Sequence, residues 1–200
     1  MRKSYSKFTI TEIYETFGVQ VIAAPGLFAD EAEWKVNDFL VEQILDNLPL
    51  AHAIGTEKAK SEMLVAPILT ELRRIKKKEI SLFSGVEFNV DAKQGLKGVC
   101  DFLVSRSPLQ YMIHAPVIVL VEAKDDSLDD GLPQCLAEMI AARLFNQARN
   151  NSINTIYGSV TRGSDWNFIK LENNTALVDS KEYSIENPHK IMGILLSMLA

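Results

Sequence analysis

Three charged residues stand at the ends of two apolar stretches in the middle of the chain. Residues 117–121 are apolar and mostly β-branched, and they lead directly into Glu122, an alanine and Lys124. In a β-strand, residues i and i+2 project from one face about 7 Å apart, so Glu122 and Lys124 would stand side by side. Upstream, Asp101 interrupts a second strand-like stretch, residues 98–104. The pattern predicts that two carboxylates and one ammonium group meet where two strands lie together.

Such a set of residues suits the hydrolysis of a phosphodiester. Asp101 and Glu122 supply hard oxygen ligands, which Mg²⁺ or Mn²⁺ accepts together with waters and phosphate oxygens. The metal would lower the pKa of a bound water and neutralise developing charge. Lys124 could orient that water or stabilise the pentavalent phosphate as a point charge. The three residues therefore predict a metal-dependent phosphodiester hydrolase.

A simpler interpretation exists for part of this pattern. A strand that ends in Glu122 and Lys124 and runs on into two aspartates can merely be a strand that reaches solvent. Asp101 fits that interpretation less well, because an Asp between apolar neighbours is unfavourable in a strand. A buried carboxylate also needs a partner or a metal.

The order of these residues resembles the PD-(D/E)xK phosphodiesterase superfamily, which includes many restriction endonucleases and recombination nucleases. Its signature is a carboxylate followed on the next strand by (D/E)-x-K, which would here be Asp101 and then Glu122 with Lys124. Cys100 replaces the Pro of the signature. The resemblance covers residues 56–160. It implies a helix carrying an acid, a three-stranded antiparallel unit, a helix and a further strand.

The resemblance implies two more site residues. Glu62, in a helical segment before the sheet, corresponds to the acid of the family's first helix, which supports the metal or its waters; otherwise it lies on the helix surface. Gln134 opens the helix after the Glu122 strand, where RecB-like nucleases place a Gln; otherwise it simply occupies a first turn. Glu138 stands where those nucleases usually carry Tyr. The metal ligands would thus be Asp101, Glu122 and Glu62.

Hydrophobic periodicity predicts the elements that position these residues. The expected helices cover residues 11–17, 30–48, 56–78 with a kink or break at Pro67, 132–148 and 188–199. The expected strands cover residues 85–90, 98–104, 117–123, 155–160 and 166–171. A strand–helix–strand crossover is normally parallel and right-handed. We therefore expect one α/β domain over residues 1–200, with a restriction-endonuclease-like mixed β-sheet flanked by helices and additional N-terminal helices.

Composition is that of an ordinary globular protein. The 200 residues are 47% hydrophobic, enough for one domain with a sizeable core. The longest apolar runs are far shorter than the roughly 18 residues of a membrane span, and no signal-peptide core follows the basic start. These features predict a cytoplasmic protein without a membrane partner. Cys100 and Cys135 are expected to be reduced and buried.

The charge of the chain does not decide whether it binds nucleic acid. The net charge is −5, but nucleic-acid binding depends on a local basic face, and residues 73–78, which are Arg-Arg-Ile-Lys-Lys-Lys, offer either such a face or a solvated helix end. The acidic residues 125–130 argue against tight duplex binding beside the site, and they lack the Gly and Glu of an EF-hand. We expect DNA as substrate, with RNA less favoured. The alternative is a catalytically inactive nuclease-fold protein that binds nucleic acid or protein; a homodimer stays open.

Overall fold

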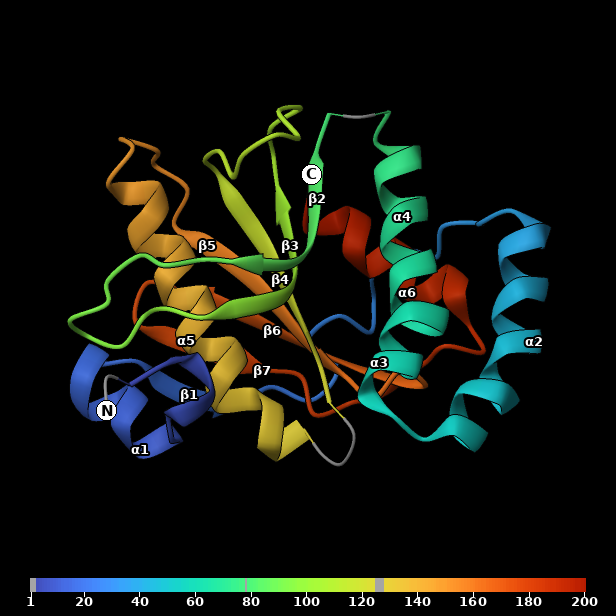
Figure 1. Ribbon diagram of the computed structural model, residues 1–200, viewed down its shortest axis with the longest axis horizontal. Helices are drawn as coiled ribbons and strands as arrows, with labels where there is room; N and C mark the ends of the chain where they lie inside the picture. The colour runs from blue at the N-terminus through green and yellow to red at the C-terminus, as the bar shows by residue number, and fades with distance from the viewer. Residues whose placement is uncertain (1–2, 78, 125–127) are drawn as a thin grey trace.

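The computed structural model describes residues 3–77, 79–124 and 128–200 (Figure 1). The helical elements are η1 (Tyr5–Lys7), α1 (Ile10–Phe17), α2 (Asp38–Ile54), α3 (Glu57–Lys60), η2 (Ser61–Val65), α4 (Ala66–Ile75), α5 (Leu128–Gln147) and α6 (Pro188–Ser197). The strands are β1 (Gln20–Ala23), β2 (Ser81–Glu87), β3 (Val99–Ser105), β4 (Val117–Ala123), β5 (Thr155–Thr161), β6 (Asp165–Glu172), β7 (Thr175–Val178) and β8 (Tyr183–Ser184).

The strands form one mixed sheet. Their order is β1-β7-β6-β5-β4-β3-β2, and β8 pairs with β6. The pairs β4–β5 and β1–β7 are parallel, whereas the other neighbours are antiparallel. Every residue of β4 is buried, as its unbroken apolar sequence predicts for a strand covered on both faces. The predicted mixed α/β architecture is therefore confirmed, including the parallel crossover from β4 through α5 to β5.

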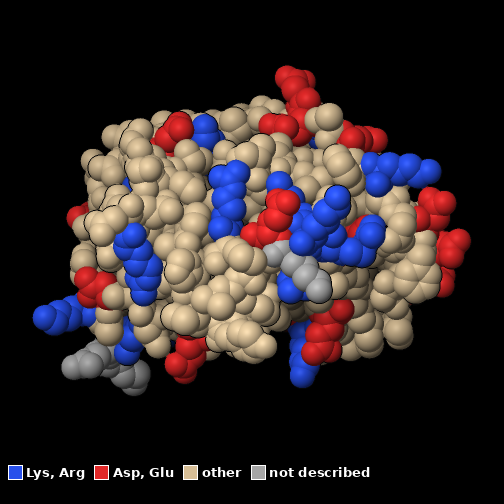
Figure 2. Space-filling model, turned by 90° about the horizontal axis from the view of Figure 1, so that it is seen from above, with Lys and Arg blue, Asp and Glu red and all other residues tan. Residues whose placement is uncertain are grey.

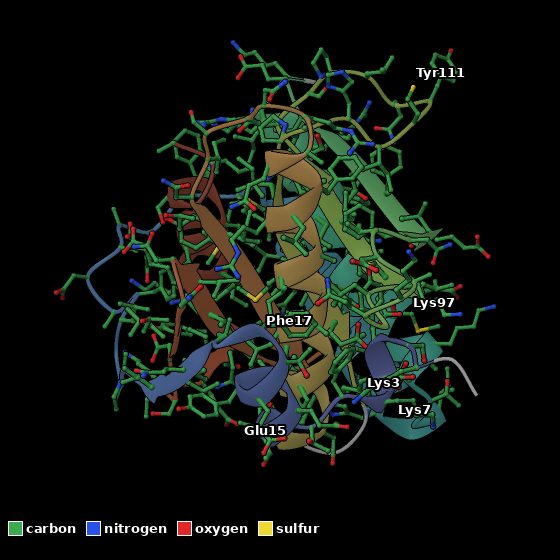
Figure 3. The ribbon with its side chains drawn as sticks, turned by 90° about the vertical axis from the view of Figure 1, so that its left-hand side faces the viewer. Lys3, Lys7, Glu15, Phe17, Lys97 and Tyr111 are labelled. Atoms are coloured by element: carbon green, nitrogen blue, oxygen red, sulfur yellow. The ribbon has the colours of Figure 1, made fainter. Side chains whose placement is uncertain are left out.

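Helices cover both faces of this sheet, and each face has its own core. On one face α4 and α6 pack against apolar side chains that include Phe102 and Trp166. On the other face α5 lies across the sheet, with η1 and α1 against it (Figures 1 and 3). Within the described residues, no helix is both long enough and apolar enough to cross a membrane.

The helix predicted over residues 30–48 is displaced along the chain. It begins at Asp38 and ends at Ile54. Asn37 caps its start, because its side-chain oxygen accepts a hydrogen bond from the backbone N–H of Leu40 at 2.8 Å. Gly55 ends it in the left-handed conformation, with φ of 71°. These two caps override the apolar periodicity on which the prediction rested.

The helical segment predicted over residues 56–78 occurs as α3, η2 and α4 in direct succession. Thr56 caps its start by accepting a hydrogen bond from the N–H of Ala59 at 3.2 Å. The intervening η2 is a π-helical turn just before Pro67. Because proline lacks an N–H and collides with the carbonyl of the preceding turn, a wider turn accommodates it without breaking the helix. Residue 78 lies outside the described residues.

Candidate active site

Asp101 and Glu122 come from neighbouring antiparallel strands. β3 pairs with β4 so that Phe102 stands opposite Val121, and the same register continued by one residue puts Asp101 opposite Glu122 on one face. Asp101 Oδ2 accepts a hydrogen bond from the backbone N–H of Ala123 at 2.9 Å. This carboxylate therefore fixes the end of β4 directly beside Glu122, and the strand pattern correctly predicted their proximity.

Glu122 and Lys124 form an ion pair. Lys124 Nζ lies 2.5 Å from Glu122 Oε1. The Glu122 side chain is 1% exposed and that of Lys124 is 21% exposed. The second oxygen, Glu122 Oε2, is buried and has no hydrogen-bond partner among the described residues. A buried carboxylate oxygen without a donor is costly, so this atom is the one on Glu122 that can accept a further hydrogen bond or bind a cation.

The three groups differ in how their surroundings favour charge. Burial raises the pKa of Glu122 to about 8, and repulsion from Asp101 adds to the effect, while Lys124 opposes it. Burial likewise raises the pKa of Asp101, against the hydrogen bond from Ala123 and the attraction of Lys124. Burial acts to lower the pKa of Lys124, but the attraction of Glu122 outweighs it, so that pKa is raised. The site thus holds a lysine whose charged form is favoured and two carboxyl groups whose neutral forms are favoured by burial.

A cavity of about 210 Å³ opens beside Asp101. Its walls come from the α3–η2 segment, from β2 and from the ends of β3 and β4, and they comprise Glu57, Lys58, Ser61, Ser84, Gly85, Asp101 and Ala123. Asp101 is thus the predicted site residue among those that line the cavity, whereas Glu122 and Lys124 do not line it.

Glu57, rather than Glu62, is the acid that the helix brings to this cavity. Glu57 lines it, and its charge raises the pKa values of both Glu122 and Lys124. The Glu62 side chain is 66% exposed, and its Oε1 lies 3.7 Å from Lys58 Nζ. Glu62 lines a different groove, between α2 and α4. The structure therefore does not bring Glu62 together with the other predicted residues, which favours its interpretation as a helix-surface acid. The N-capping Thr56 was the available signal that Glu57 starts this helix.

Gln134 forms a hydrogen bond with Glu138, the residue that stands where RecB-like nucleases usually carry Tyr. Its Nε2 donates to Glu138 Oε1 at 3.2 Å. Glu138 is fully buried, and its Oε2 has no hydrogen-bond partner among the described residues. Burial raises the pKa of Glu138 well above its usual range, and repulsion from Glu122 adds to this. Gln134 thus connects to the site through Glu138, and it does not line the cavity.

The donor set fits a hard divalent cation with few protein ligands. Asp101 and Glu122 offer carboxylate oxygens, one of them buried and without a donor. Among the described residues, no three His, Cys, Asp or Glu side chains are grouped closely enough to enclose a metal. Mg²⁺ commonly binds through one or two carboxylates and keeps several waters, so two protein ligands suffice. The acidic segment 125–130 lies partly outside the described residues, which lack 125–127.

Comparisons with known proteins include a structural similarity to a DNA complex. No family model matches the chain, and no curated protein matches it. A cryo-EM structure of a DrdV–DNA complex is similar to this chain, with 15% sequence identity and a TM-score of 0.44. The similarity covers 80% of this chain and 13% of that chain. The chain therefore spans about an eighth of the length of the protein that it matches.

Proposed function

We propose that this chain is a metal-dependent phosphodiester hydrolase that acts on DNA. The observation that supports this proposal is the convergence of Asp101, Glu122 and Lys124 at one edge of the β3–β4 pair, with a buried oxygen of Glu122 left without a donor. Perturbed carboxyl groups around a cavity are typical of functional sites. The restriction-endonuclease-like character of the fold belongs to the same proposal.

Asp101 and Glu122 would hold Mg²⁺ or Mn²⁺. Bound there, the metal would supply Lewis acidity for the phosphate and a more acidic water. Asp101 Oδ2 already accepts the N–H of Ala123, so Asp101 Oδ1 is the atom left to bind. Glu122 Oε1 already accepts from Lys124, so Glu122 Oε2 is the corresponding atom there. Each carboxylate thus uses one oxygen to fix its own position and offers the other.

Lys124 would bind the substrate as a cation. Its raised pKa keeps the ammonium group charged at neutral pH. An ammonium group has three donors, and one of them is directed to Glu122. The others can bind the phosphate oxygens, on which negative charge increases in the transition state. Glu57 and Ser61 on the opposite wall of the cavity would limit how closely a strand approaches.

Cleavage assays test this proposal. Purified protein is incubated with single- and double-stranded DNA in the presence of Mg²⁺, Mn²⁺ or a chelator. We expect cleavage with metal and none with chelator. Asp101→Asn and Lys124→Gln should abolish cleavage, whereas Asp91→Asn, in the β2–β3 connection, should leave it unchanged. Cleavage by Asp101→Asn at the wild-type rate would refute the assignment.

Metal binding can be measured without turnover. A metal that binds only the folded protein stabilises it by about 1.4 kcal/mol at roughly tenfold excess over its Kd. This stabilisation should vanish in Glu122→Gln but persist when Asp129 and Asp130 are both replaced by Asn. The opposite result would move the metal to the acidic segment and remove the main support for catalysis.

The burial of Glu122 favours a second candidate, a catalytically inactive module that binds nucleic acid or protein. Glu122 already forms an ion pair with Lys124, and neither of these two residues lines the cavity. Under this alternative, divalent metals would neither stabilise the protein nor induce cleavage, while nucleic-acid binding would persist in chelator. A homodimer stays a prediction that the oligomeric state in solution would test.

A further inference from the structure

Cations gather at the end of the molecule opposite the candidate active site. The distal basic face consists of Arg73, Arg74, Lys76 and Lys77 at the C-terminal end of α4 and of Arg106 just after β3. Figure 2 looks down on this end and shows Lys and Arg side chains grouped around the end of α4. The helical segment from Glu57 to Ile75 would span about 27 Å at 1.5 Å per residue. The distal basic face is therefore remote from the cavity at Asp101.

Backbone contacts join the two parts of this face. Lys76 Nζ donates to the carbonyl oxygen of Leu199 at 3.2 Å, and Arg106 Nη2 donates to the same oxygen at 2.9 Å. Arg106 Nη2 also donates to Ala200 O. Because Lys76 and Arg106 share one acceptor, α4 and the end of β3 hold their charges side by side. The cations thus form one surface although they are distant in sequence.

Two acidic side chains, those of Glu71 and the exposed Glu79, lie close in sequence to the four cations at the end of α4. Glu71 makes two hydrogen bonds of 2.6 Å to Arg74 and balances that residue. Arg73 Nε is buried and has no hydrogen-bond partner among the described residues. Lys77 is exposed in a left-handed conformation, with φ of 48°. The surface therefore keeps a net positive charge, which attracts a polyanion.

An exposed aromatic side chain stands beside this face. The connection between β3 and β4 carries Tyr111, which is 99% exposed, and Met112, which is 59% exposed. Gln110 fastens this connection to β2, because its side chain accepts from Leu82 N at 3.3 Å and donates to Leu82 O at 2.7 Å. Figure 3 shows Tyr111 projecting outward at this end of the molecule. The two bonds of Gln110 thus anchor the backbone next to Tyr111, while the Tyr111 side chain itself stays open to solvent.

We propose that the distal basic face and Tyr111 bind an unpaired segment of nucleic acid, a deepening that rests on the proposed action on DNA. Cations that track phosphates and an aromatic ring on which a base stacks are the two components of single-strand binding sites. Gln110, the neighbour of Tyr111, contacts Leu82, and Leu82 is five residues after Lys77. Even a fully extended chain therefore places Lys77 within about 18 Å of Leu82. That distance corresponds to a few nucleotides of an extended strand. A duplex would offer the same phosphates but no free base face to Tyr111.

Binding to labelled oligonucleotides in chelator tests this inference, because chelator prevents metal-dependent cleavage. Tyr111→Ala should weaken binding of a single strand about tenfold, since base–aromatic stacking has roughly that effect per base. Binding of the matching duplex should not change. Tyr14→Ala, on α1, is the matched control, because Tyr14 is also an exposed tyrosine, at 55%. It should bind single strands as wild type does.

The salt dependence tests the contribution of the cations. Lys77→Ala should reduce the slope of log affinity against log salt by about 0.7, the value for one phosphate contact to a single strand. Lys7→Ala should leave the slope unchanged, because Lys7 lies at the other end of the molecule from Tyr111 (Figure 3). Equal effects of Tyr111→Ala and Tyr14→Ala would overturn the inference. So would tighter binding to vesicles of anionic lipid than to single strands.

The two proposals fail in different ways. Tyr111-dependent binding in chelator without any cleavage in Mg²⁺ would retain this inference and refute the hydrolase. Metal-dependent cleavage combined with Tyr111-independent binding would retain the hydrolase and refute this inference.

Discussion

Lys124 Nζ lies 2.5 Å from Glu122 Oε1, yet the two partners are unequally buried. Glu122 is almost inaccessible, whereas Lys124 keeps a fifth of its side chain in contact with solvent. The desolvation of Glu122 by burial raises its pKa more than the attraction of Lys124 lowers it. The pKa of Glu122 is therefore raised although its partner is charged. The ion pair therefore offsets only part of the cost of burying the Glu122 carboxylate.

Removal of the Lys124 ammonium group should destabilise the folded protein. Lys124→Met leaves Glu122 buried without a cation, and at about pH 9, above the pKa of Glu122 in the wild type, we expect a loss of about 1–3 kcal/mol in the free energy of unfolding, less than a deeply buried pair would lose. The double variant Glu122→Gln/Lys124→Met should recover most of that loss, because no buried charge remains. Urea denaturation of the single and double variants measures the coupling. Additive losses would contradict the expectation.

Glu138 should make the protein less stable as the pH rises. Its pKa in the folded state is raised above the ordinary 4.5, so above that pH the folded state binds more protons than the unfolded state and stability falls. The slope cannot exceed about 1.4 kcal/mol per pH unit for one group. Glu138→Gln cannot ionise and should be more stable than wild type, by a margin that grows as the pH rises above about 5. A constant margin across thermal unfolding curves would refute this.

Gly131 keeps the first turn of α5 close to the site. A Cβ at this position would lie 2.5 Å from Val160 Cγ1 and 3.0 Å from Lys124 Cγ. Gly131→Ala should therefore displace Lys124 and reduce cleavage at least tenfold. Stability should change little, because the gain in helix propensity of about 1 kcal/mol offsets part of the overpacking. Val160→Ala in the same chain should restore much of the activity, and no recovery would argue against a steric cause.

Asp179 should be the most sensitive polar position outside the site. Its Oδ1 accepts from the N–H groups of Gly26 and Lys181 at 2.7 and 2.9 Å. Its Oδ2 accepts from Phe28 N at 3.1 Å and Tyr183 Oη at 2.8 Å. Asp179→Ala leaves these donors without an acceptor, and we expect a loss of about 3–5 kcal/mol in denaturant unfolding. Asp179→Asn keeps one acceptor oxygen and should lose less.

The convergence of Asp101, Glu122 and Lys124 could be predicted because it depends on local geometry. The i, i+2 spacing of a strand fixes Glu122 beside Lys124, and an apolar run next to each residue identifies its strand. Two adjacent strands in sequence usually pair, which brings Asp101 to the same place. These predictions needed no knowledge of the rest of the chain.

The identity of the helical acid could not be predicted in the same way. Glu57 and Glu62 lie on one helical segment, but their spacing of five residues places them on different faces of a helix, and the sequence does not indicate which face meets the sheet. Glu62 also lies within the π-helical turn η2, whose winding departs from the α-helical period on which the prediction rested. The short strands β1 and β7 were also missed, since they pair with each other across most of the chain and neither is long enough to show alternation.

β4 occupies the interior of the sheet, between β5 and β3, and every one of its residues is buried. Amide hydrogens in such a strand exchange with solvent only when the whole domain opens. The backbone that carries Glu122 and anchors Asp101 should therefore rank among the slowest-exchanging parts of the protein. The other walls of the cavity come from α3 and from β2, which has a strand neighbour on one side only, so we expect the amides of these two elements to exchange faster than those of β4.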